Sequence, residues 1–183
     1  MTGLDATASI GPVSVWTDEQ TRELRKLTDA VYPPEEPDSW PGAVLDWSGP
    51  EMGVRVVDSD GWLVSYVGVL VRDSLHDEQP VRIGGIGGVK THPDVRGMGL
   101  AALGMDKATE WLRGDARADF GLLVCQDELL DYYGRMGWKV FEGTLLTEQR
   151  GESRVFTFNR VMTRDLVAPG PTEGVIDIQG PAW

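Results

Sequence analysis

One segment of the sequence carries a residue pattern that suits binding of a phosphate group. Residues 84–101 read GGIGGVKTHPDVRGMGLA, a glycine-rich apolar run followed by a second glycine-containing stretch and the start of a helical pattern. A loop that opens a helix in this way directs backbone N–H groups and the positive end of the helix dipole towards one spot. Gly97 and Gly99 let the backbone approach an anion without a Cβ in the way, and Arg96 adds a positive charge. The pattern therefore predicts a pyrophosphate site.

Three interpretations of this segment are open. The spacing Gly97-x-Gly99-x-x-Ala102 fits the loose fingerprint of dinucleotide-binding folds, although the preceding elements look antiparallel and no second strand–helix–strand unit follows. In a second interpretation the glycines serve only turns. In the third, the loop holds the pyrophosphate of an acyl-CoA.

The elements around the loop follow from capping, periodicity and turn residues. Thr17 with Gln20 forms a capping box that opens a helix. The β-branched runs at 53–57 and 62–71 are joined through Asp60-Gly61, which predicts a hairpin, and a turn at 74–80 leads into a strand at 81–91. The later pattern predicts a helix from Leu100. After it we expect strands at 120–125 and 138–141, with a short helix at 128–136 between them. The segments 144–148 and 154–158 are expected to pair with each other. This order predicts an α/β (α+β) fold with a mixed sheet and one parallel crossover.

Composition limits the class of protein. The 183 residues predict one domain, 1–183, in which 165–183 form an acidic tail that we expect to fold onto the acceptor site. We expect no membrane span and no signal peptide, and one cysteine with two histidines predicts neither a disulfide nor a metal site. A reducing cytoplasm is the expected location. Seventeen Lys and Arg against 29 Asp and Glu give a net charge of −12, which disfavours nucleic acid and anionic membranes as partners.

Carboxylates are concentrated in the stretch 29–60, which contains eight of them and one base, Arg55. One interpretation is a solvated surface that keeps the protein soluble. The other is an acidic collar that attracts a cationic ligand.

Two blocks of the sequence resemble the GCN5-related N-acetyltransferases (GNAT). Arg96 to Ala101, RGMGLA, matches the [Q/R]-x-x-G-x-[G/A] pattern of that family, and Tyr133 stands four residues before Gly137-Trp138, as in its Y-x-x-x-G-[F/W] pattern. The resemblance covers about residues 13–160. It implies an acetyltransferase fold, a mixed central sheet whose central parallel strands splay apart and are flanked by helices.

The same resemblance implies acetyl-CoA as cofactor. It places the pantetheine arm along Val89, Lys90 and Thr91, and the pyrophosphate on the loop. It makes Tyr133 the acid that protonates the departing thiolate. The loop residues implied are Arg96, Gly97, Met98, Gly99, Leu100 and Ala101.

The finer resemblance is to the aminoglycoside 2'-N-acetyltransferases, with the kasugamycin-acetylating branch as a second relative. It is carried by residues 133–143, YGRMGWKVFEG, by chain size, and by an acidic tail that ends on Trp183, whose carboxylate we expect to meet an ammonium. Those enzymes have a glutamate base where this chain has Gly87. We therefore look for the base and for acceptor contacts elsewhere, at Glu35, Glu36, Asp38, Trp40, Asp46, Gly88 and Asp177.

The leading expectation is acetylation of a cationic aminosugar antibiotic, an activity that confers antibiotic resistance, by direct attack in a ternary complex. The alternatives are an acetyltransferase for another small amine or a peptide amine, and a catalytically silent acyl-CoA-binding domain. The sequence is compatible with a homodimer.

Overall fold

The computed structural model describes residues 4–32 and 41–183 of the chain. The helices are α1 (Asp18–Val31), α2 (Leu100–Gly114) and α3 (Leu130–Gly134), with short 3-10 turns at Val13–Val15, Pro41–Val44, Pro93–Val95 and Asp127–Leu129. The strands are β1 (Ala6–Pro12), β2 (Met52–Asp58), β3 (Leu63–His76), β4 (Gln79–Thr91), β5 (Phe120–Cys125), β6 (Lys139–Val140), β7 (Thr144–Gln149), β8 (Glu152–Val155), β9 (Arg160–Asp165) and β10 (Val175–Asp177).

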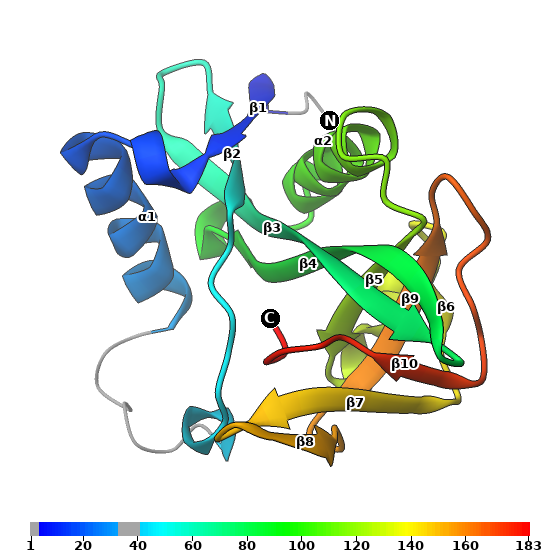
Figure 1. Ribbon diagram of the computed structural model, residues 1–183. Helices are drawn as coiled ribbons and strands as arrows, with labels where there is room; N and C mark the ends of the chain where they lie inside the picture. Colours follow the sequence, from blue (N-terminus) through cyan, green and yellow to red (C-terminus); the bar gives the residue numbers. More distant parts are fainter. Residues whose placement is uncertain (1–3, 33–40) are drawn as a thin grey trace.

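The described strands form one mixed sheet in the order β6-β9-β5-β4-β3-β10-β7-β8 (Figure 1). The long strand β3 has two partners on one edge: its first part pairs with β2, which in turn pairs with β1, and its end pairs with β10. The β4–β5 pair is parallel and is connected through α2, as the sequence predicts, whereas β5 and β9 are antiparallel. The predicted mixed sheet and α/β fold class are confirmed.

The two faces of the sheet are covered by different elements. Alternate residues of a strand point to opposite faces. Val67 and Val69 of β3 are buried in the cluster that contains Met105 of α2, whereas Tyr66 is buried with Leu27 of α1. A helix therefore covers each side of the central strands, and α1 marks the face on which Tyr66 lies.

The central parallel pair separates part-way along its length. The last paired residues are Ile86 of β4 and Leu123 of β5, although both strands continue. On its other edge β4 has a bulge against β3, since Tyr66 pairs with Lys90 while Gly68 pairs with Gly87. A bulge bends the strand that carries it. The splay implied by the family resemblance is thus present, next to the bulge.

Gly88 makes this bulge possible. Its φ is +60°, a left-handed conformation that glycine adopts without steric cost. At this position of the glycine-rich strand β4, the backbone conformation therefore explains why the residue is glycine.

Several predicted elements differ from those observed. The chain turns between β3 and β4 at Asp77 and Glu78 alone, with φ of +47° and +65°, so both strands are longer than the predicted turn at 74–80 allowed. The first described strand, β1, precedes the capping box and is followed by the 3-10 turn Val13–Val15. The sequence did not predict β9 and β10. β9 has six residues and pairs with β5, whereas β10 has only three and pairs on both edges, with β3 and with β7.

Candidate functional site

The loop before α2 is open to solvent and presents backbone groups. Gly97 and Gly99 have φ of +79° and +80°, and a Cβ on either residue would meet nothing within 4 Å. Gly99 is the N-cap of α2, and no side chain caps this helix end. The first amides of a helix have no partner within the helix, so here they are available to an anion.

The remaining predicted loop residues have different surroundings. Leu100 is buried in the core cluster, and Met98 is exposed. Arg96 is exposed, and its Nε donates to the Thr91 carbonyl at 3.3 Å, which connects the loop with the end of β4. Ala101 follows Leu100 in the first turn of α2.

The free end of β4 is held from the β3 side. The hydroxyl of Ser65 donates to the Lys90 carbonyl at 2.7 Å and lies 2.9 Å from the Thr91 hydroxyl. Val89 packs against the core cluster that α2 covers. These contacts fix β4 beyond the point at which β5 leaves it.

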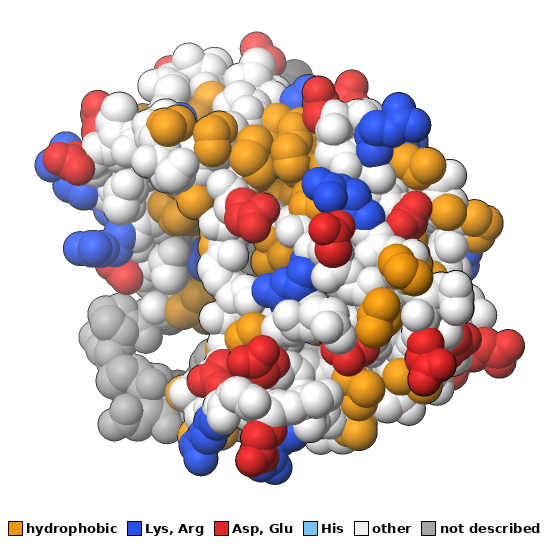
Figure 2. All heavy atoms as spheres, viewed as in Figure 1, with side chains coloured by type: hydrophobic (Ala, Val, Ile, Leu, Met, Phe, Trp, Pro, Cys, Tyr) orange, Lys and Arg blue, Asp and Glu red, His pale blue; other side chains and the backbone are white. Residues whose placement is uncertain are grey.

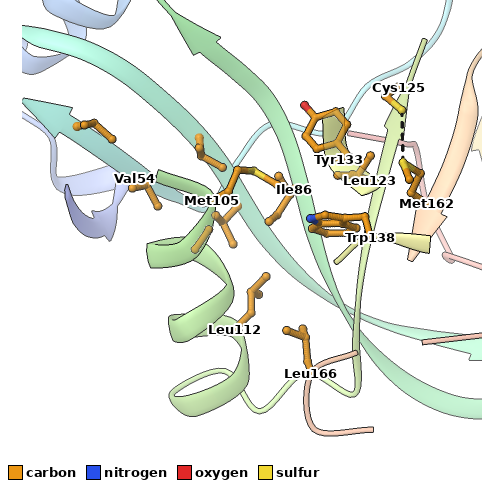
Figure 3. Close-up of a cluster of buried hydrophobic side chains, with 14 of the residues drawn as sticks. Val54, Ile86, Met105, Leu112, Leu123, Cys125, Tyr133, Trp138, Met162 and Leu166 are labelled. Carbon is orange, nitrogen blue, oxygen red and sulfur yellow. Dashed lines mark hydrogen bonds between the residues drawn. The ribbon is translucent and has the colours of Figure 1, made fainter. Parts of the chain in front are cut away.

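Tyr133 of α3 lies in the core cluster with Leu123 and Cys125 of β5 and is only 7% exposed. In Figure 3 its hydroxyl points away from Met162 and Trp138. Burial, followed by the nearby Cys125 thiol, raises the pKa of Tyr133 above its ordinary value. The phenol therefore stays protonated at neutral pH, and it holds its proton more tightly than a free phenol does.

A pocket of about 210 Å³ lies where β4 leaves β5. Its lining combines glycine backbone with side chains from distant segments. The lining residues are Leu24, Ser48, Pro50, Tyr66, Gly68, Val69, Leu70, Gly85, Gly87, Gly88, Lys90 and Trp183. We call this space the acceptor-side pocket.

Trp183 forms one wall of the acceptor-side pocket. Its indole Nε1 donates to the Leu122 carbonyl at 3.2 Å, and the Arg72 guanidinium lies 5.2 Å from the ring centroid. A Cβ on Gly85 would collide with the indole, and a Cβ on Gly87 would lie 2.9 Å from the backbone carbon of Trp183. Trp183 thus fills the space of a side chain at position 87, which gives a packing reason for the absence of a glutamate there.

Two predicted acceptor residues lie apart from this pocket. The Asp46 carboxylate accepts a hydrogen bond from the Arg150 amide at 2.6 Å, and the Asp177 carboxylate accepts one from the Gln179 amide at 2.9 Å. The Asp46 carboxylate thus binds the distant turn between β7 and β8, whereas the Asp177 carboxylate stabilises its own turn. Neither residue lines the pocket. Four further predicted residues, Glu35, Glu36, Asp38 and Trp40, lie outside the described residues. The structure brings together Gly87, Gly88, Lys90 and Trp183.

The sequence did not single out Tyr66 or the side chain of Lys90. Both line the acceptor-side pocket, and both belong to strands whose apolar runs suggested only core or cofactor contacts. The available signal was the alternation along β3, which puts Tyr66 and Gly68 on the face opposite Val67.

The surface drawn in Figure 2 carries no continuous acidic field. Acidic and basic side chains are interspersed on this face, with apolar side chains between them. Within the described residues no helix is long and apolar enough to cross a membrane.

The sequence model of the family described as Acetyltransferase (GNAT) family matches residues 21–138, more than half of the chain. The chain belongs to this family. Membership confirms the predicted enzyme class, an acetyltransferase, and with it acetyl-CoA as the acyl donor. No curated protein matches the sequence.

Solved structures share the GNAT fold at low sequence identity. An acyl-CoA N-acyltransferase from Pseudomonas aeruginosa is 21% identical with a TM-score of 0.61, covering 87% of this chain and 99% of its own. The GNAT family N-acetyltransferase YhbS from Escherichia coli, solved in complex with CoA, is 13% identical with a TM-score of 0.63, covering 97% and 92%. Escherichia coli ElaA is 19% identical with a TM-score of 0.60, covering 87% and 99%. At these identities the likeness establishes the fold.

Proposed function

We propose that this GNAT acetyltransferase transfers the acetyl group of acetyl-CoA directly to the amine of a small acceptor bound in the acceptor-side pocket. The observation that carries the proposal is the parting of β4 from β5 after Ile86 and Leu123, between the open loop of α2 and the pocket. A bound acyl-CoA would lie with its phosphates at Gly97 and Gly99, and its pantetheine arm along Val89 and Thr91. Structural neighbours solved in complex with CoA and with acetyl-CoA support acetyl-CoA as the donor.

The chemistry required of the chain is limited. Acetyl-CoA supplies the thioester. A backbone N–H at the free end of β4 would polarise the thioester carbonyl, in the manner of an oxyanion hole. The neutral amine attacks from the pocket, its nitrogen forms the amide bond as the C–S bond breaks, and Tyr133 gives its proton to the leaving thiolate. The amine nitrogen releases its proton to water, and the Tyr133 phenolate takes a proton back from water, so the protons balance over one turnover.

Two acceptor classes are open to this enzyme. A cationic aminosugar is supported by the net charge of −12 and by the resemblance of residues 133–143 to aminoglycoside acetyltransferases. A second class is another small amine or a peptide amine, and it stays in view because the charged side chain among the described lining residues is a cation, Lys90.

The proposal is tested by following thiol release from acetyl-CoA with a panel of aminoglycosides, amino acids, peptides and simple polyamines. We expect release that depends on an amine and a mass increase of one acetyl group on it. Tight binding of acetyl-CoA without turnover on any amine would instead identify a silent acyl-CoA-binding domain.

Substitution of Trp183 tests whether the pocket binds the acceptor. We expect Trp183→Ala to raise the KM of the acceptor more than about tenfold, because the wall of the pocket over Gly85 and Gly87 is lost. The affinity for acetyl-CoA, measured by calorimetry, should change little. Trp62→Ala is the matched control, since that indole is exposed in the turn before β3. An unchanged acceptor KM in the Trp183 variant would remove this residue from acceptor binding.

A further inference from the structure

Two walls of the acceptor-side pocket come from segments that are far apart in the sequence. Trp183 belongs to residues 178–183, called the end segment below, and Ser48 belongs to the stretch before β2. The two segments meet in one isolated bridge, Trp47 with Ala182, rather than in a regular ladder. The position of both walls therefore depends on side-chain contacts.

Arg72 of β3 supplies these contacts from just outside the pocket. Alternate residues of a strand share a face, so Arg72 lies on the same face of β3 as the lining residues Tyr66 and Gly68. Its Nη1 donates to the Pro181 carbonyl at 2.7 Å, and its Nη2 donates to the Ser48 hydroxyl at 2.6 Å. One guanidinium thus binds both segments.

The same guanidinium contacts the wall residue Trp183. Its Cζ lies 5.2 Å from the centre of the indole ring, which is a cation–π contact. The indole Nε1 donates to the Leu122 carbonyl at 3.2 Å, and Leu122 pairs with Gly85 just before β4 and β5 part. Two contacts, one from β3 and one to β5, therefore hold the indole where the splay begins.

The end segment passes directly against Arg72. A Cβ on Gly180 would lie 2.9 Å from Arg72 Nη1 and 3.0 Å from Cζ, so a side chain there would displace the guanidinium. The preceding residue, Gln179, has a φ of +53°, and its amide donates to the Asp177 carboxylate at 2.9 Å. The turn at 179–180 thus brings the backbone up to the guanidinium.

The guanidinium keeps its charge in this setting. Burial lowers the pKa of Arg72, and the nearby carboxylates of Glu51 and Glu148 raise it. Arginine is protonated at working pH, and its planar group donates in several directions while it stacks on an aromatic ring. A lysine or a methionine at this position could not contact Pro181, Ser48 and Trp183 at once.

We propose that Arg72 is the positioning residue of the acceptor site: without touching the acceptor, it fixes the indole of Trp183 as a wall of the pocket and ties it to the segment of Ser48. The inference rests on the proposed acetyl transfer, because it requires that the acceptor binds in this pocket. Arg72 is not among the described lining residues, so its effect on the acceptor passes through Trp183.

Fluorine NMR tests the position of the indole without any acceptor. In protein labelled with 5-fluorotryptophan, the resonance that is lost in Trp183→Phe identifies Trp183 among the seven tryptophans. In Arg72→Met we expect that resonance to move towards its position in the unfolded protein, because the cation–π contact and the hydrogen bond to Pro181 are lost. Arg154→Met is the matched control and should leave it in place, since Arg154 is exposed and pairs with Glu152 of the same strand.

Kinetics test the effect on the acceptor, using the amine that gives the highest turnover in the panel. We expect Arg72→Met to raise the acceptor KM about tenfold, while kcat and the calorimetric affinity for acetyl-CoA change little. Arg72→Lys keeps the charge and can restore one hydrogen bond, so it should raise the acceptor KM less. It also serves as the second variant should methionine disturb the fold. A residue that only stabilised the fold would lower the melting temperature and affect both substrates alike.

A double-mutant cycle shows whether Arg72 acts through Trp183. Trp183→Ala already removes the wall, so adding Arg72→Met to it should raise the acceptor KM by no more than about threefold. If the two effects instead multiply in full, Arg72 acts independently of the indole and the inference is wrong.

The outcomes separate this inference from the proposed function. An unmoved Trp183 resonance in Arg72→Met, or a moved resonance with an unchanged acceptor KM, overturns the inference and leaves acetyl transfer in place. A wild-type protein that binds acetyl-CoA and acetylates no amine of the panel contradicts the proposed function, and the role of Arg72 in acceptor binding falls with it.

Discussion

Replacing Gly99 by valine is expected to lower the affinity for acetyl-CoA by on the order of 100-fold or more, equivalent to about 2.7 kcal/mol. Gly99 has a φ of +80° and its Cβ position is open, so the protein itself leaves room for a side chain. That room is where the proposed pyrophosphate meets the first amides of α2. A β-branched side chain would occupy it and would also strain the left-handed backbone.

Two further variants keep this prediction testable should valine disturb the loop. Asparagine tolerates a positive φ, so Gly99→Asn adds bulk with less backbone strain and should also weaken binding. Gly114→Ala is the control at the other end of α2, where a Cβ meets nothing within 4 Å and the φ is not positive. Calorimetry gives the affinity and circular dichroism the fold. Unchanged affinity in a folded Gly99→Val protein would place the phosphates elsewhere.

Much of the fold follows from local sequence because its signals are strong and short in range. The capping box of Thr17 and Gln20 is present, Asp60-Gly61 joins β2 to β3, and α2 begins directly after Gly99. The strands β9 and β10 escaped prediction for the opposite reason. Arg160–Asp165 mixes charged and apolar residues, and its strand conformation depends on pairing with β5, nearly 40 positions earlier in the chain.

The acyl-donor half of the candidate site was predictable, whereas most of the acceptor half was not. The loop and β4 are one continuous segment, so residue types and spacing suffice to recognise them. The acceptor-side pocket is assembled from five separate parts of the chain, with Leu24, Ser48, Tyr66 and Trp183 meeting over the glycines of β4. No local pattern reports that the Tyr66 hydroxyl has no hydrogen-bond partner among the described residues, or that the Arg150 amide donates to the Asp46 carboxylate.

Tyr133→Phe should lower kcat by about 100-fold or more, the range expected when a positioned acid is removed. The ring packs beside Leu123 and Cys125, so phenylalanine keeps the core contacts and loses only the hydroxyl. The KM for acetyl-CoA should therefore change little. Tyr132→Phe is the control on the same helix, because Tyr132 contacts Tyr133 edge-on, at 5.2 Å between ring centroids, and is the weaker candidate for the acid.

The pH dependence of kcat distinguishes an acid from a packing residue. Burial raises the pKa of Tyr133 above that of a free phenol, about 10, so the group remains protonated throughout the range from pH 7 to 9. The loss in Tyr133→Phe should thus be the same at both ends of this range, and no decline in wild-type kcat below pH 9 should come from Tyr133. If the variant instead retains wild-type kcat with an unchanged pH profile, Tyr133 serves the core alone and the proton for the thiolate comes from water or from another residue.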